Sequence, residues 1–159
     1  LEFRRVLFRS DNMIENVIKF LLDNDTNKNS HSGRMLIDHL MGTANLLREW
    51  ECDENVVLAG LCHSIYGTDS YHTVTIDHSR REEVKNLIGE KAEHLAWEFG
   101  IRKNPRLYSF IVNKEIDLTV IECANLIEQK VEPHNLAAAT AISLPKKVSE
   151  AVNKYLKNY

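Results

Sequence analysis

The chain has 159 residues, of which 43% are hydrophobic and 27% are charged, and its formal net charge is -3. This length and balance are typical of one globular domain with a buried core. The acidic excess argues against a surface for nucleic acid or anionic membrane, because such surfaces need clustered lysine and arginine. Since no apolar run approaches the roughly 20 residues that span a bilayer, the chain has no predicted membrane partner.

The first ten residues, Leu1 to Ser10, read LEFRRVLFRS, and their reverse translation gives the end of a widely used short-read sequencing adapter. The stretch is too basic, and its apolar part too short, for a signal peptide. We interpret residues 1–10 as an assembly artefact and expect a single native domain over residues 11–159. The three cysteines form no CxxC pair, which is typical of free thiols in a reducing cytoplasm.

Apolar residues recur at helical spacing along most of the chain. The pattern predicts helices over about residues 13–22, 33–50, 53–66, 79–89, 90–100, 105–112, 118–129 and 145–156. Asp11 or Asn12 is expected to cap the first helix and Asp53 the third. Gly67–His78 has no helical period and is predicted to be a loop, with a short extended piece at Thr73–Ile76. The predicted fold class is all-α, a compact bundle of about six to eight helices.

Two histidines stand at opposite ends of neighbouring predicted helices. His39 lies early in the second helix and His63 at the end of the third. Because the short turn Glu51–Glu54 joins them, the two helices are expected to pack antiparallel, which brings the imidazoles together. Two neutral imidazoles suit Mn, Fe, Co or Zn. The alternative is that each histidine is a buried, hydrogen-bonded helix residue.

The residues around His63 carry a family resemblance. Ala59–Thr68 (AGLCHSIYGT) resembles the A-x-L-L-H-D-I-G segment of HD-domain phosphohydrolases, and most closely that of the bacterial alarmone (ppGpp) hydrolases. There, a helix histidine precedes the His-Asp pair at about the spacing of His39 and His63, and a later helical segment ends in Phe-Gly, as does Glu98-Phe99-Gly100. The resemblance covers about residues 31–130. The His-Ser-Ile-Tyr-Gly-Thr stretch is also similar to a family of unknown function that carries it.

The resemblance implies an HD-like helical bundle with metal-dependent phosphohydrolase activity, and His39 and His63 as the first two metal ligands. Ser64, however, stands where the paired aspartate belongs, and Asn125 where the last aspartate belongs. Their neutral oxygens are poor ligands for a hard dication. Tyr66-Gly67-Thr68 replaces the acids that position the attacking water in the alarmone hydrolases, so hydrolysis of alarmone itself is disfavoured.

Other residues are candidates to rebuild such a site. His31 lies eight residues before His39 and can share a helix face with it, and His72 follows in the loop. Asp69 and Glu122 are candidates to supply negative charge. A rebuilt four-histidine site holding Mn, Fe or Zn and a weak or lost metal site therefore both stay open.

Further residues are assigned to the candidate pocket by their position. Asp38 is the candidate to orient a histidine or act as a base, and Tyr66 to present its phenol to a substrate. Arg34 is interpreted as a salt-bridge partner of Asp38 or, alternatively, as a phosphate clamp. The pocket is completed by Ser64, Thr68, Glu122 and Asn125.

Three functional hypotheses follow. The first is an HD-like phosphohydrolase acting on a small phosphorylated or nucleotide-like compound, in which a metal activates the attacking water. The second is a degenerate HD fold that binds a small molecule or a partner protein without turnover, because Ser64 and Asn125 replace acids. The third is an iron oxygenase, by analogy with related helical folds. No organic cofactor is expected, and the oligomeric state is left open.

Overall fold

The computed structural model describes residues 2–31 and 34–159, with side chains for residues 12–30 and 34–159. Over these residues the chain is all-α, as predicted. Its α-helices are α1 (Glu2–Asp23), α2 (Leu36–Glu49), α3 (Glu54–Leu61), α4 (Arg81–Ile88), α5 (Glu90–Ile101), α6 (Arg106–Val112), α7 (Ile116–Glu128) and α8 (Lys146–Lys157). Shorter elements are the strands β1 (Ser30–His31) and β2 (Arg34–Met35) and the 3-10 helices η1 (His78–Arg80), η2 (Pro133–Asn135) and η3 (Ala137–Ala141).

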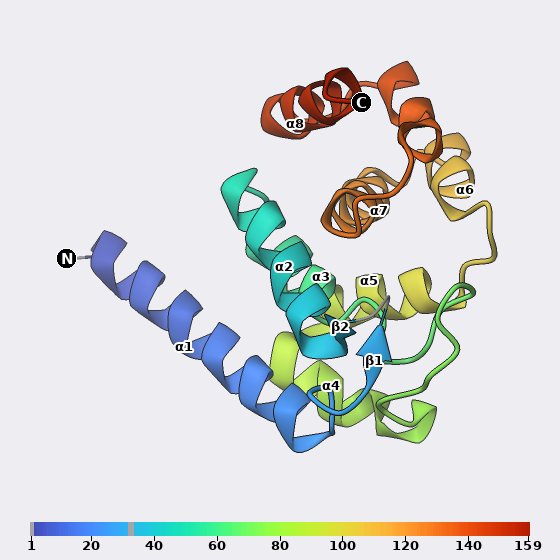
Figure 1. Cartoon of the computed structure of the whole chain (residues 1–159). Helices are drawn as coiled ribbons and strands as arrows, with labels where there is room; N and C mark the ends of the chain where they lie inside the picture. Colours follow the sequence, from blue (N-terminus) through green and yellow to red (C-terminus); the bar gives the residue numbers. More distant parts are fainter. Residues whose placement is uncertain (1, 32–33) are drawn as a thin grey trace.

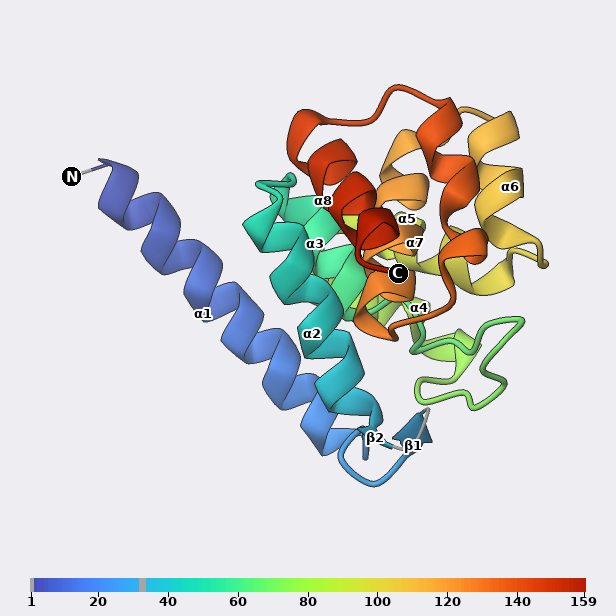
Figure 2. The same ribbon diagram turned by 45° about the horizontal axis from the view of Figure 1, so that its top comes forward.

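The helices surround one hydrophobic core. Helix α2 packs against α3 and α7, and α3 packs against α5. In Figure 1, α8 and η3 lie above α7 and α6 lies to its right, while α4 lies below, beside the C-terminal end of α1. Figure 2 shows α1 extending away from the other helices toward its N-terminus. Over the part of the chain that the structure describes, no helix is long and apolar enough to cross a membrane.

Helix α1 begins earlier than predicted. The expected cap at Asp11 or Asn12 is wrong, because the backbone is helical from Glu2 to Asp23. No proline or glycine occurs in this stretch, so no residue breaks the helical hydrogen bonding around Asp11. Helix α2 begins three residues later than predicted, and helices α4 to α8 begin and end within two residues of the predicted bounds.

Helix α3 begins as predicted and ends five residues early. The Asp53 carboxylate caps it by accepting a hydrogen bond from the backbone N–H two residues on, at 2.9 Å. The predicted end at Tyr66 is wrong, because α3 stops at Leu61 and continues as turns. At this end, the Nδ1 atom of His63 donates to the carbonyl oxygen of Gly60 at 2.7 Å, in addition to the backbone N–H of His63 at 3.5 Å.

Close packing of α2 on α3 depends on Gly60. A Cβ atom at this position would lie 2.2 Å from Cδ1 of the buried Leu47 side chain on α2. Such a distance is far inside van der Waals contact. The missing side chain of Gly60 therefore lets the two helices approach closely just before His63.

The loop that follows α3 is irregular, as predicted. The expected extended piece at Thr73–Ile76 is not a strand in the described residues. Instead, the backbone N–H groups of Thr75 and Ile76 both donate to the carbonyl oxygen of Ile65 at 2.9 Å. These bonds hold the loop against the turn after α3.

The three cysteines are free thiols that burial makes unreactive. Burial raises the pKa of Cys62 and of Cys123 to about 12, and burial together with Asp117 and Asp53 raises the pKa of Cys52 to about 11. Since the thiolate is the nucleophile, we expect Ellman's reagent to leave Cys62 and Cys123 unmodified in folded protein at pH 8. Cys52 should react far more slowly than free cysteine. Protein in guanidinium is the positive control, and rapid reaction of three thiols in folded protein would contradict the prediction.

Candidate functional site

The two predicted histidines meet in the protein interior. His39 on α2 is fully buried, and His63, in the turn after α3, is 2% exposed. Their Nε2 atoms are 3.3 Å apart, and their rings are nearly perpendicular, at 81°. The structure thus brings the imidazoles together, as the antiparallel packing of the two helices predicts.

Each imidazole is oriented through its other ring nitrogen. The Nδ1 atom of His63 is bonded to the carbonyl oxygen of Gly60, and Nδ1 of His39 lies 2.9 Å from Oε1 of Glu128 on α7. Both partners accept hydrogen bonds, so a neutral imidazole with its proton on Nδ1 satisfies each of them. Each Nε2 atom then carries a lone pair that faces the other ring. Histidines that bind metals are oriented in this way by a carbonyl or carboxylate behind them.

Asn125 on α7 adds an oxygen atom to the same place. Its Oδ1 atom lies 2.9 Å from Nε2 of His39. Its Nδ2 atom donates to Oε1 of Glu122 at 2.9 Å, and Nε2 of Gln129 donates to its Oδ1 at 2.8 Å. These two bonds fix the amide with its oxygen toward the histidines.

The protonation of His39 favours the same arrangement. Burial lowers the pKa of His39 below its ordinary value of 6.5, and this effect outweighs the opposite effects of the Glu128 carboxylate and of the contact with Asn125. The ring is therefore neutral at neutral pH. With its single proton on Nδ1, it keeps a lone pair on Nε2.

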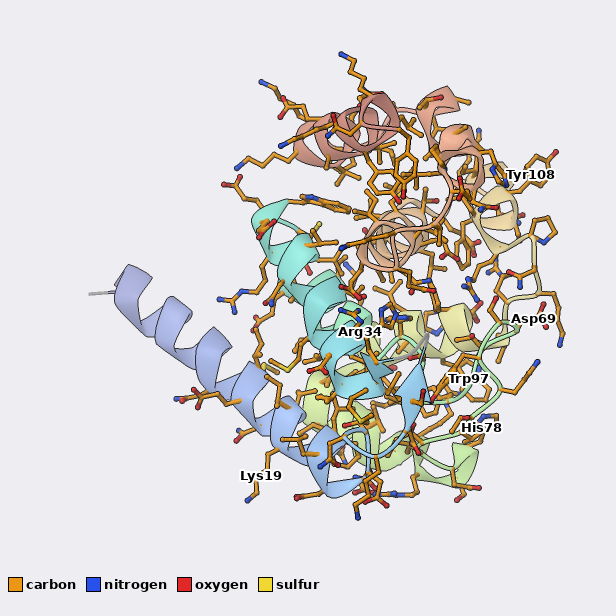
Figure 3. The ribbon with its side chains drawn as sticks, in the orientation of Figure 1. Lys19, Arg34, Asp69, His78, Trp97 and Tyr108 are labelled. Atoms are coloured by element: carbon orange, nitrogen blue, oxygen red, sulfur yellow. The ribbon has the colours of Figure 1, made fainter. Side chains whose placement is uncertain are left out.

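Two arginines form ion pairs with the carboxylates that contact His39 and Asn125. Arg34 pairs with Glu128, and Arg106 pairs with Glu122. Arg34, labelled in Figure 3, is half exposed, whereas Arg106 and Glu122 are both buried. The acidic partner of Arg34 and His39 was expected to be Asp38. It is Glu128 instead, because α7 packs on α2 and Asp38 is exposed.

Glu128 reaches His39 because Gly42 leaves it room. A Cβ atom at Gly42 would lie 2.6 Å from Oε2 and 2.8 Å from Cδ of Glu128. Any side chain at this position would displace the carboxylate. The absence of a side chain at Gly42 on α2 thus leaves the space that the Glu128 carboxylate of α7 occupies.

A cavity of about 190 Å³ lies beside the histidines. The Phe99 ring packs edge-on against His63, with ring centres 5.0 Å apart, and the guanidinium carbon of Arg106 lies 4.5 Å from the centre of the Phe99 ring. The residues that line the cavity are Ser30, His63, Ser64, Thr68, Ser70, Tyr71, Phe99, Arg106, Asn125 and Gln129. Ser64, Thr68 and Asn125, all expected in a pocket, therefore share one cavity with His63.

Other histidines do not join the pair in the described part of the chain. His72 is exposed in the loop after α3 and lines a different hollow, together with Asp69. Asp69, at the edge of the domain in Figure 3, accepts a hydrogen bond from the Asn104 backbone at 2.9 Å. The side chain of His31 lies outside the described residues. Among the residues described, no group of three or more His, Cys, Asp or Glu side chains is arranged to hold a metal.

Tyr66 belongs to a second cluster, formed with α4 and α5. Its hydroxyl donates to Oε1 of the buried Glu93 at 3.0 Å, and Arg81 donates to the same oxygen at 2.7 Å. The rings of His78 and Trp97, both labelled in Figure 3, pack edge-on against Tyr66. Burial raises the pKa of Tyr66, so its phenol stays protonated. The expected role toward a substrate is replaced by a structural one, because α3 ends early and turns Tyr66 toward α5.

Sequence reasoning missed three residues of the site: Arg106, Glu128 and Gln129. The last two carried a signal, because polar residues recur every three or four positions in the apolar helix α7, beginning at Glu122 and Asn125. Such a polar stripe on a buried helix indicates a polar cluster in the core. Arg106 follows a proline at the start of a short helix and carried no comparable signal.

In comparisons with known proteins, one family model matches part of this chain. The model of a family described as "Domain of unknown function (DUF6817)" matches residues 20–103, more than half of the chain. No curated protein and no solved structure matches. The matched segment holds His39 and His63, whereas Arg106, Asn125 and Glu128 follow it in the chain.

Proposed function

This chain belongs to the DUF6817 family, and we propose from its site that it is a metal-dependent hydrolase of a small phosphorylated compound. The divalent ion would be held by His39, His63 and Asn125. One observation carries the proposal: Nε2 of the buried His39 lies beside both Nε2 of His63 and the amide oxygen of Asn125.

The distances from Nε2 of His39 to the other two atoms are compatible with one shared ion. Ligand atoms about 2.0–2.1 Å from the same ion lie roughly 3 Å from one another when they are neighbours. Nε2 of His39 is 3.3 Å from Nε2 of His63 and 2.9 Å from Oδ1 of Asn125. Imidazole nitrogens and an amide oxygen suit Mn, Fe or Zn. The likeness of the segment around His63 to HD-domain phosphohydrolases supports the same assignment.

The chain's own residues would prepare the site for hydrolysis. A bound divalent ion supplies polarisation of a phosphoryl oxygen and a lowered pKa for water. Glu128 and the Gly60 carbonyl hold the two imidazoles in orientation, and Arg34 holds Glu128 in turn. The Phe99 ring covers one edge of His63 and excludes water from that side.

Metal content tests the proposal directly. Elemental mass spectrometry of protein reloaded with Mn, Fe or Zn should find near-stoichiometric metal, and His63→Ala should hold at least about tenfold less, because one of two nitrogen ligands is lost. Hydrolysis of p-nitrophenyl phosphate should fall with the metal. His94→Ala is the matched control, since His94 is exposed on α5. Wild-type protein that stays metal-free after reloading, with its fold intact by circular dichroism, would overturn the proposal.

A second function is favoured by the charges around the site. The two nearest carboxylates, Glu122 and Glu128, are each paired with an arginine, so they leave little net negative charge for a dication. Neutral Ser64 and Asn125 add none. A binding module for a small phosphorylated ligand, without turnover, is therefore the alternative. It predicts that the ligand binds to metal-free protein and is not hydrolysed in the presence of metal.

A further inference from the structure

Two buried polar atoms near the histidines lack hydrogen-bond partners. They are the hydroxyl oxygen of Ser64 and Nη1 of Arg106, and neither has a partner among the residues that the structure describes. Ser64 is 1% exposed and Arg106 is 6% exposed. An unsatisfied buried donor is rare in folded proteins, because its lost hydration is not compensated. Two of them in residues that line one site need a physical reason.

Both residues line the same cavity of about 190 Å³. The Arg106 guanidinium is fixed from two sides, because its Nε atom donates to Glu122 and its plane lies over the Phe99 ring. A second arginine with similar surroundings lacks this feature. Arg102 pairs with Glu115 and lies over Phe110, yet its Nη1 and Nη2 atoms are both hydrogen-bonded. Of these two arginines, only the one at the cavity has a buried donor without a partner among the described residues.

We propose that this cavity is an oxyanion subsite that binds the phosphate group of a small organic phosphate. Arg106 Nη1 and the Ser64 hydroxyl would donate to its oxygens. A guanidinium held in a fixed plane is well suited to phosphate, because it presents charged donors in a rigid geometry. The choice of phosphate as the bound group rests on the proposed function. Binding of phosphate to the subsite itself needs no metal.

The organic part of the ligand has space next to the subsite. A groove of about 430 Å³ shares Arg106, Asn125 and Gln129 with the cavity. Its remaining wall combines apolar side chains such as Leu107 and Leu126 with amides such as Asn135. Apolar faces with a few hydrogen-bonding groups suit a ring that has polar edges. The ligand class is therefore a phosphate monoester that carries such a ring, as in a nucleoside monophosphate.

Calorimetric titration with inorganic phosphate and with AMP, in EDTA, tests the subsite apart from any metal. Arg106→Lys keeps a positive charge beside Glu122 and removes the second donor, so affinity for inorganic phosphate should fall at least about tenfold. Arg102→Lys is the matched control and should stay within about twofold. Ser64→Ala removes a donor to the phosphate group, so it should weaken phosphate binding. Because this hydroxyl has no described partner in the protein, the melting temperature should be unchanged.

The outcomes separate this inference from the proposed function. Wild-type protein that binds no phosphate, or variants that all bind it equally well, would overturn the subsite. AMP should bind at least about fivefold more tightly than inorganic phosphate, and equal affinities would overturn the assignment of the groove. Because EDTA is present throughout, loss of metal binding or hydrolysis in other experiments bears on the proposed function alone.

Discussion

Replacing Glu122 with glutamine is expected to lower the free energy of unfolding by about 3–5 kcal/mol, because it leaves the buried Arg106 without its counter-charge. Glu122 is 2% exposed and Arg106 is 6% exposed, so solvent screens little of the charge that loses its partner. The loss is largest when one partner of a buried pair is removed and the other remains. Urea denaturation followed by circular dichroism measures it.

The matched control is Glu115→Gln. Glu115 pairs with Arg102, which also lies over a phenylalanine ring. This second pair reaches solvent, since the side chain of Glu115 is 32% exposed. Solvent screening reduces its contribution to about 1 kcal/mol or less. Equal losses in the two variants would show that burial of the Glu122 pair has no energetic consequence.

Replacing Phe99 with alanine should destabilise the domain by about 3–5 kcal/mol, because it removes a completely buried ring and enlarges the cavity that this ring lines. Phe99 is completely buried and contacts the ring of His63, the guanidinium of Arg106 and the ring of Phe110. The variant should also release His63 and Arg106 from their fixed orientations. Thermal unfolding measures the stability change.

An exposed aromatic residue provides the comparison for Phe99→Ala. Tyr108 on α6 points outward in Figure 3 and is 62% exposed. Tyr108→Ala should change the stability by no more than about 0.5 kcal/mol. Similar shifts in melting temperature for the two variants would contradict the role of Phe99 as the support of the site.

The features that the sequence predicted are those that depend on neighbouring residues. Helix bounds follow from apolar spacing, which is local, so most were correct within about two residues. The meeting of His39 and His63 followed from one short turn between two helices, Glu51–Glu54. The cap at Asp53 likewise needed only the next two residues.

The features that the sequence did not predict depend on packing between distant segments. Asp38 is the acidic residue closest to His39 in the chain, yet Glu128 reaches the ring because α7 packs on α2. His72 stays apart from the pair because its loop is held against the turn at Ile65. The unsatisfied atom of Arg106 has no sequence signature, because it depends on which neighbours the folded chain leaves around that side chain.

The fit between Gly42 and Glu128 couples substitutions at two distant positions. A relative that acquired alanine in place of Gly42 would have to move or shorten the side chain that corresponds to Glu128, and the contact of this carboxylate with His39 would then change. Gly42 lies within residues 20–103, which the family model matches, and Glu128 lies beyond them. An alignment of the matched segment alone would thus display the glycine without the residue that requires it.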